Sequence, residues 1–341
     1  MSKSTTPPLP HDPKPHVPYL TSYDSLPVSL PADFLTSAPP KTITAAPIDW
    51  PSTPLPEWQG RHATVLDNVL TPQECELLLA LAERSATDQS RPWQPAMVNI
   101  GAGREILEPE YRNSDRIVWD EDEVVRRLWA RVKLARHGDG TPFFADDGPM
   151  VWASGDAVDG GWRFWGLNRR MRFLKYGPGQ FFRRECFFFF FFFFFFFFFF
   201  FFFFFFFFFF FFFFLRARRE MRDCPTDSTT AHCDGTYEEA AEGRHLRTYY
   251  TVHFYLNDSV QAVGDDAGAD LKGGATCFLS YDEKRRLDVD PKAGRALVFQ
   301  HPRMYHAGDD VLAGTKYTMR TEMMYELVDS VSKDKDDEEL A

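Results

Sequence analysis

The chain has 341 residues and a formal net charge of −11, and 28 of its 38 phenylalanines form one unbroken run, Phe187–Phe214. The mixed apolar and charged content excludes collagen-like, coiled-coil and wholly disordered chains. The acidic balance argues against a general nucleic-acid binder, because phosphate neutralisation needs an excess of lysine and arginine. The five cysteines lie at irregular spacings, which suits a reducing compartment and is neither a disulfide framework nor a zinc ribbon.

The N-terminal part is rich in proline. Residues 1–58 hold 14 of the 24 prolines, with serine and threonine between them, and predict an extended, disordered leader. The first residues, MSKSTTPPLP, contain no apolar signal core, so we expect a cytoplasmic or nuclear protein. One folded domain is then expected over residues 59–327, followed by a solvated acidic tail at 328–341.

Two helices are predicted near the start of this domain. Thr71 as N-cap, Pro72 at the first helical position and Glu74 as capping-box partner mark the first helix. A second helix is expected at about 121–136, capped by Asp120, because apolar residues recur there at helical spacing.

Beyond about residue 165, the apolar period changes to two, which predicts strands. The expected strands are 171–176, 249–256, 274–280, 295–300 and 316–325, separated by glycine, proline and aspartate. Helices followed by several short strands favour a mainly β fold, an antiparallel sandwich or barrel with flanking helices.

The phenylalanine run has the length of a membrane span, which needs roughly 20 apolar residues. Natural spans mix several apolar residue types, so a pure phenylalanine run does not indicate one, and we expect no membrane association. Phenylalanine codons are TTT or TTC, and the gene therefore carries a long pyrimidine tract. Such tracts belong in introns, upstream of a 3′ splice site.

The flanks of the run fit a retained intron. Arg184-Glu185-Cys186 can be encoded with GTGAGT, a 5′ splice sequence, and Thr230-Ala231 can supply the terminal AG. Excision removes 231 − 184 = 47 codons in frame and joins Arg183 through a new proline to His232. The hypothesis is that segment 184–231, which interrupts the domain, comes from unspliced message.

The most informative chemical motif is His232-Cys233-Asp234, because residues i and i+2 of a strand point to the same face. A second such motif, His137-Gly138-Asp139, follows a helix and is interpreted as a turn. The downstream context distinguishes the first motif, because His306 lies 72 residues beyond Asp234, after a predicted strand and a short loop. Two histidines and one carboxylate form the facial triad of non-haem Fe(II) oxygenases, with positions left open for a 2-oxo acid and O₂.

The ordered motifs resemble the prolyl 4-hydroxylase-like branch of the 2-oxoglutarate and Fe(II)-dependent dioxygenases. The resemblance covers about residues 60–327. The matching stretches are 174–182 (LKYGPGQFF), 232–235 (HCDG), 254–257 (FYLN), 273–278 (GGATCF), 291–299 (PKAGRALVF) and 306–317 (HAGDDVLAGTKY). It implies a double-stranded β-helix core of the jelly-roll or cupin type, with iron held by His232, Asp234 and His306.

The same resemblance implies a set of co-substrate residues. Lys316 would bind the C5 carboxylate of 2-oxoglutarate, and Arg320, on the same strand face, is its rival. Tyr255 would support that carboxylate with its hydroxyl, and Tyr176 would contact the co-substrate or the substrate. His253 and His301 are expected to line the barrel or lie on the surface, without binding metal.

The implied reaction is hydroxylation of a C–H bond, with Fe(II), 2-oxoglutarate and L-ascorbate as cofactors and succinate and CO₂ as products. No catalytic residue is expected beyond the metal ligands, and the carboxylate of Asp234 argues against halogenation. The substrate is a prolyl residue of a protein or peptide, or a small molecule handled by an enzyme of the same superfamily. The remaining alternatives are a non-enzymatic binding module, a protein anchored by the phenylalanine run, and an impaired enzyme if segment 184–231 is translated.

Overall fold

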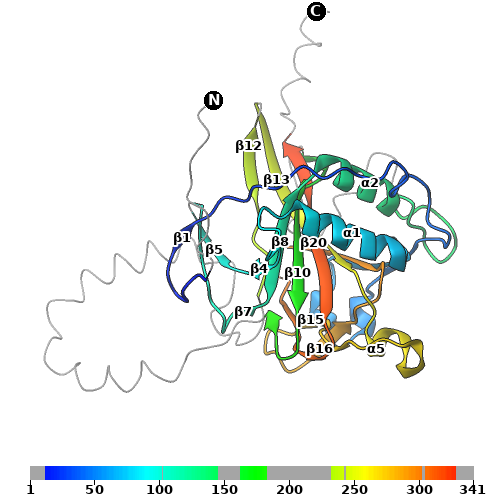
Figure 1. Cartoon of the computed structure of the whole chain (residues 1–341). Coiled ribbons are helices and arrows are strands. Elements are labelled where there is room, and N and C mark those ends of the chain that lie inside the picture. The colour runs from blue at the N-terminus through cyan, green and yellow to red at the C-terminus, as the bar shows by residue number, and fades with distance from the viewer. Residues whose placement is uncertain are drawn as a thin grey trace, which may run out of the picture.

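The computed structural model describes residues 12–101, 103–144, 162–182, 232–241, 243–301 and 304–327 (Figure 1). The interrupting segment 184–231 and the expected acidic tail 328–341 lie outside these residues. Within the described ranges, no helix is both long and apolar enough to span a membrane.

The larger of the two main sheets has ten strands, and the long pair β13–β20 forms its centre. Inward and outward residues alternate along β13, so Val252 and Phe254 enter the core while Thr251 and His253 face the other way. The sheet runs β2 (Thr44–Pro47), β3 (Ala63–Asp67), β17 (Ala296–Gln300), β13 (Arg244–Tyr255), β20 (Lys316–Leu327), β10 (Arg170–Tyr176), β8 (Asp115–Asp120) and β4 (Gln94–Pro95), with β12 (Glu238–Ala241) beside β13 and β9 (Trp162–Leu167) beside β20.

The smaller main sheet has five strands and faces the inner side of the larger one. Its order is β16 (Arg286–Val289), β15 (Thr276–Leu279), β18 (His306–Gly308), β11 (Phe181–Phe182) and β7 (Arg112–Asn113). One cavity is lined both by β10, β13 and β20 of the larger sheet and by β7, β11, β15 and β18 of the smaller sheet. Two antiparallel sheets closed around a shared interior make the expected double-stranded β-helix. The five expected strands are confirmed as β10, β13, β15, β17 and β20.

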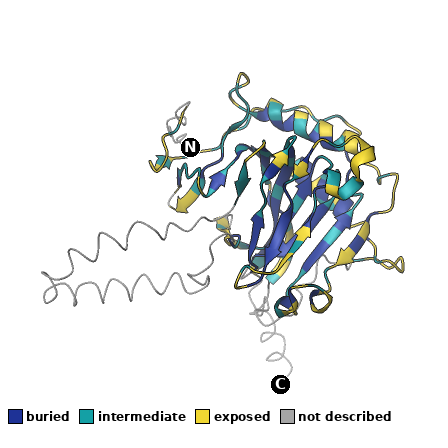
Figure 2. Cartoon of the chain, turned by 90° about the horizontal axis from the view of Figure 1, so that it is seen from below, coloured by how far each residue is buried: buried dark blue, intermediate teal, exposed yellow. Residues whose placement is uncertain are grey.

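Two helices, α1 (Pro72–Ser85) and α2 (Asp122–Val132), cover the outer face of the larger sheet. Figure 2 shows them along one side of the sheet, with buried strands beneath. Leu78 of α1 and Leu128 of α2 are fully buried in one cluster with Phe173 of β10. Burial of such side chains contributes roughly 1.5–3 kcal/mol each, and it holds the larger sheet rigid behind the cavity.

The N-cap expected for the first helix is present, and the one expected for the second is replaced by a neighbouring residue. Thr71 and Glu74 form the predicted capping box, with Thr71 Oγ1 accepting from the Glu74 amide at 3.2 Å. The second helix is shorter than expected, and its N-cap is Glu121, not Asp120. Asp120 ends β8, and its carboxylate forms an ion pair with Arg170 of the neighbouring strand at 2.7 Å. The side chain is therefore engaged across the sheet and does not cap the helix.

The N-terminal segment differs from the disordered leader expected for residues 1–58. Strand β2 pairs with β3 from Thr44 to Pro47, and Ile43, Trp50 and Leu55 are at most 2% exposed. Proline removes backbone donors, which favours an extended chain, but the apolar residues between these prolines bury against the fold. The packed domain therefore begins before residue 44.

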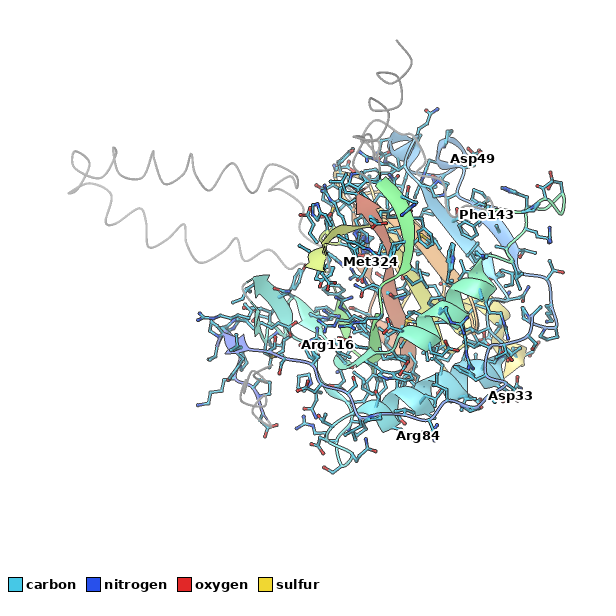
Figure 3. The ribbon with its side chains drawn as sticks, turned by 90° about the horizontal axis from the view of Figure 1, so that it is seen from above. Asp33, Asp49, Arg84, Arg116, Phe143 and Met324 are labelled. Atoms are coloured by element: carbon cyan, nitrogen blue, oxygen red, sulfur yellow. The ribbon has the colours of Figure 1, made fainter. Side chains whose placement is uncertain are left out.

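The remaining elements lie at the edges. A small sheet joins the hairpin β5 (Val98–Gly101) and β6 (Arg104–Ile106) to β1 (Tyr19–Leu20), and a second joins β14 (Lys272–Gly273) to β19 (Val311–Ala313). Arg116 of β8, labelled in Figure 3, binds Glu105 of β6 at 2.7 Å and so fastens the first small sheet to the main fold. Short helical turns complete the chain: η1 (Trp50–Ser52), η2 (Pro56–Trp58), α5 (Val260–Val263) and η3 (Asp265–Ala267).

Candidate metal centre

His232 and His306 are brought together by backbone pairing. They form an antiparallel bridge in which each backbone amide donates to the carbonyl of the other, at 2.9 and 3.0 Å. Their imidazole ring centroids lie 4.3 Å apart. Asp234 follows two residues after His232, and its carboxylate lies 3.7 Å from His306 Nε2 and 4.0 Å from His232 Nε2. The three expected ligands thus converge, all buried, with ligand atoms within 4.8 Å of one another.

The two imidazoles have the protonation state that a metal requires. Burial lowers the pKa of both rings, and for His232 the neighbouring His306 adds to the shift. His306 Nδ1 lies 3.0 Å from the Met304 carbonyl, which places the proton on Nδ1 and leaves the Nε2 lone pair facing Asp234. His232 has no hydrogen-bond partner for either buried ring nitrogen among the described residues. A buried imidazole without a partner fits a metal ligand, and the set fits a facial triad.

The carboxylate of Asp234 is held from both sides. Thr251 donates its hydroxyl to Oδ2 at 2.5 Å, and the Arg320 guanidinium binds Oδ1 at 2.7 Å. Burial alone would raise the pKa of Asp234, but Arg320 and the imidazoles outweigh burial and hold the pKa far below its ordinary value. Asp234 is therefore ionised and fixed in orientation before any metal binds.

Lys316 and Arg320, the two expected rivals, occupy different environments. Arg320 is engaged with Asp234 and also lies 3.4 Å from Glu322. Lys316 is 3% exposed and has no carboxylate within 4 Å among the described residues. Its ammonium lies 5.1 Å from the ring centre of Tyr176, and burial lowers the pKa of Lys316 to about 8. Both Lys316 and Tyr176 line the cavity, so an acidic group there would meet Lys316 as an uncommitted cation.

Tyr255 lies behind one wall of the cavity. Its ring is fully buried, and its hydroxyl donates to Thr276 Oγ1 at 2.7 Å. Thr276 lines the cavity and Tyr255 does not, so the tyrosine supports the wall from behind. The register of β13 sets this position, since Tyr255 is the last residue of the strand.

Further residues at or beside the cavity were given no binding role from sequence. Thr251 and His253 belong to the inward polar face of β13, and the alternation along this strand is a signal for both. His253 lines the cavity as expected, whereas Arg112 and Phe182 reach it from two-residue strands that carry no periodic signal. The second motif, His137 to Asp139, forms an exposed turn. A hydrogen bond from the Gly140 amide to the His137 carbonyl closes this turn.

The cavity beside the three ligands has a volume of about 30 Å³, room for roughly one water molecule. A 2-oxo acid is larger than this. Its entry therefore requires cavity side chains to change position, and Arg320, which bridges Asp234 and Glu322, is among the lining groups.

Phe182 and His232 both pair with strand β18, although the 49 residues 183–231 separate them in sequence. Phe182 pairs with Gly308 and His232 pairs with His306, so only Ala307 lies between their partners on β18. The chain leaves the smaller sheet and returns to it at nearly the same point.

Comparison with known proteins gives a family-model match to part of the chain. Residues 221–321 match the family model described as the 2OG-Fe(II) oxygenase superfamily, a range that contains all three metal-ligand candidates together with Lys316 and Arg320. No curated protein sequence matches the chain.

Several solved structures are similar at low identity. A viral collagen prolyl hydroxylase from Paramecium bursaria chlorella virus-1, in complex with 2OG, is 14% identical with a TM-score of 0.37, over 78% of this chain and 96% of that one. A Trichoplax adhaerens prolyl hydroxylase, bound to a hypoxia inducible factor peptide, is 13% identical with a TM-score of 0.42, over 79% and 86%. A Pseudomonas putida prolyl-4-hydroxylase is 13% identical with a TM-score of 0.39, over 79% and 95%. Such scores assign no residue and no substrate.

Proposed function

Because residues 221–321 match the model of the 2OG-Fe(II) oxygenase superfamily, we propose that the chain is a prolyl 4-hydroxylase-like enzyme that hydroxylates a C–H bond and releases succinate and CO₂. The observation that carries the proposal is the buried set His232, Asp234 and His306, with neutral imidazoles and an oriented carboxylate. When bound there, Fe(II) and 2-oxoglutarate would supply the oxidation with O₂ as the oxidant, one oxygen atom entering the substrate and the other the succinate.

The protein's own contribution is orientation and charge. Two imidazoles and one carboxylate leave open positions on an octahedral ion, and Thr251 fixes the carboxylate that would complete the set. Lys316 binds the distal carboxylate of 2-oxoglutarate in this proposal, because it is the buried cavity lysine without an acidic partner in the described part of the chain. Arg320 is left to Asp234.

A small-molecule substrate is the second candidate. Ascorbate, as a reductant for the iron, belongs to both candidates.

We further propose that segment 184–231 derives from a retained intron. Its support is the pairing of Phe182 and His232 with neighbouring positions of β18. Excision would leave Arg183 and one proline between them, opposite the single residue Ala307, and a one-residue bulge accommodates this difference. Sequencing cDNA across codons 175–240 tests the proposal: most mature message should lack the pyrimidine tract, and message that retains it would overturn the proposal.

The enzymatic proposal is tested on two purified forms, the full chain and the chain joined from Arg183 through proline to His232. We expect the joined form to convert 2-oxoglutarate to succinate with Fe(II) and ascorbate, and we expect His232→Ala to abolish this. His137→Ala, in the exposed turn, is the matched control and should retain full turnover. Equal succinate formation by wild type and His232→Ala would refute the metal assignment.

A further inference from the structure

Arg112 is a buried cation without an acidic partner among the described residues. It is 9% exposed, its Nε atom has no hydrogen-bond partner there, and no described carboxylate lies within 4 Å of it. Two comparable buried arginines each have such a carboxylate: Arg116 has Glu105 at 2.7 Å and Arg131 has Glu74 at 2.6 Å. The partly buried Arg320 likewise has Asp234 at 2.7 Å. The partners of Arg112 are neutral: it has a side-chain hydrogen bond with Tyr176 and packs on the ring of Phe182. A buried cation without a carboxylate partner is costly, and a bound anion would offset that cost.

The position of Arg112 shows where a partner would lie. The guanidinium carbon lies 4.6 Å from the ring centre of Phe182, and the same ring lies 4.0 Å from the imidazole of His232. Tyr111 packs edge-on against Phe182 at 5.4 Å. Arg112 lines the metal cavity, one aromatic ring away from a metal-ligand candidate.

The other cations of this cavity already have assignments. Arg320 is paired with Asp234, and Lys316 lies next to Tyr176 and serves the co-substrate in the function proposed above. Burial lowers the pKa of Arg112 to about 10, which leaves the guanidinium charged at neutral pH. A second anion would therefore meet Arg112, whose planar donor fork matches a carboxylate with two parallel hydrogen bonds.

We infer that the substrate carries a carboxylate that Arg112 binds, so that the oxidised C–H group belongs to an acid or to a residue next to one. This inference rests on the proposed function. The aromatic wall of Tyr111 and Phe182 would contact the apolar part of such a substrate, while Arg112 fixes its acidic end. A free imino or amino acid and a C-terminal peptide carboxylate share this chemistry, and the test separates them.

The test uses the joined protein loaded with Mn(II), which replaces Fe(II) without oxidising the ligand. Calorimetry measures 2-oxoglutarate first, then the free imino acid L-proline, its amide L-prolinamide, and a short N-blocked peptide with the free carboxylate at a C-terminal proline. We expect the acid to bind at least about tenfold more tightly than the amide, and Arg112→Gln to remove this preference while leaving 2-oxoglutarate affinity unchanged. Tighter binding of the peptide than of the acid would identify a peptide C-terminus as the source.

Three outcomes are distinguishable. Failure of the Mn(II) protein to bind 2-oxoglutarate refutes the proposed function. Normal 2-oxoglutarate binding without a preference for the acids over the amide, including no binding of any probe, overturns the inference about Arg112 alone. Weakened 2-oxoglutarate binding in Arg112→Gln also overturns it, since Arg112 would then belong to the co-substrate.

Thermal unfolding supplies a readout that does not depend on the probe. Arg112→Met should melt at or above the wild-type temperature, because it removes an unpaired buried charge. Arg116→Met is the matched control, equally buried but paired, and should melt lower because it leaves Glu105 without its partner. A larger loss for Arg112→Met than for Arg116→Met would show that the fold itself compensates the Arg112 charge, which overturns the inference.

Discussion

Replacement of Lys316 by methionine should stabilise the free protein while removing co-substrate binding. Lys316 is 3% exposed, and burial lowers the pKa of its ammonium from 10.5 to about 8. Each pKa unit corresponds to about 1.4 kcal/mol, so the charged side chain costs the folded state on the order of 3 kcal/mol. Methionine has a similar length and no charge to bury.

The pH dependence of this effect has a definite sign. The pKa of Lys316 is lower in the folded than in the unfolded state, so the unfolded chain binds more protons between about pH 8 and 10.5. The stability of the wild type therefore rises, relative to Lys316→Met, through that window. Below pH 8 the full cost is present, and the variant should be more stable by roughly 3 kcal/mol; near pH 10.5 the difference should vanish.

Urea unfolding of both proteins at several pH values between 7 and 10.5 measures the difference directly. Lys272→Met, at the exposed start of β14, is the control and should give no gain. The reasoning fails if Lys316→Met is less stable than wild type at neutral pH, or if the difference stays constant across the window. In the wild type, 2-oxoglutarate affinity should weaken as pH rises above about 8, because the anion binds the protonated lysine.

Three further substitutions test the site and its frame. Thr251→Val removes the hydroxyl bound to Asp234 without changing side-chain shape. The substitution should lower Mn(II) affinity, measured by calorimetry, by about 10–100-fold. Unchanged affinity would show that Arg320 alone orients the carboxylate. Gly294→Ala would place a Cβ 1.9 Å from the Leu70 carbonyl oxygen and should lower the free energy of unfolding by more than about 4 kcal/mol. Its control is Gly268→Ala, at a similar positive φ with nothing within 4 Å, which should lower that free energy by only about 1–2 kcal/mol in the same chemical unfolding assay. Thr71→Ala breaks the capping box of α1 and should cost about 1 kcal/mol by the same assay, and a loss below the error of the fit would contradict the capping argument.

The metal-ligand set could be predicted from sequence because its members stand in informative local patterns. His232 and Asp234 share one face at a spacing of two, and His306 follows a strand of continuous apolar residues. The helix start at Thr71 was predictable for the same reason, since a capping box is a contact between residues three apart.

The N-terminal segment and Tyr255 mark where local patterns are insufficient. Proline content carries no information on what Trp50 and Ile43 contact. The position of Tyr255 at the end of β13 brings its hydroxyl to Thr276. Motif spacing does not fix where a strand ends, so this contact could not be predicted.

Sequence by itself determined the strand and helix types, the order of the motifs and the ligand candidates, because these depend on residues near one another in the chain. Only the tertiary structure decided the pairing of charges: Arg320 with Asp234, Arg116 with Glu105, and Arg112 with no acidic partner among the described residues. It also brought Phe182 and His232 to the same side of β18, where their partners Gly308 and His306 are separated by one residue. Partners of this kind are set by sheet register and by the packing of distant segments, which no local pattern encodes.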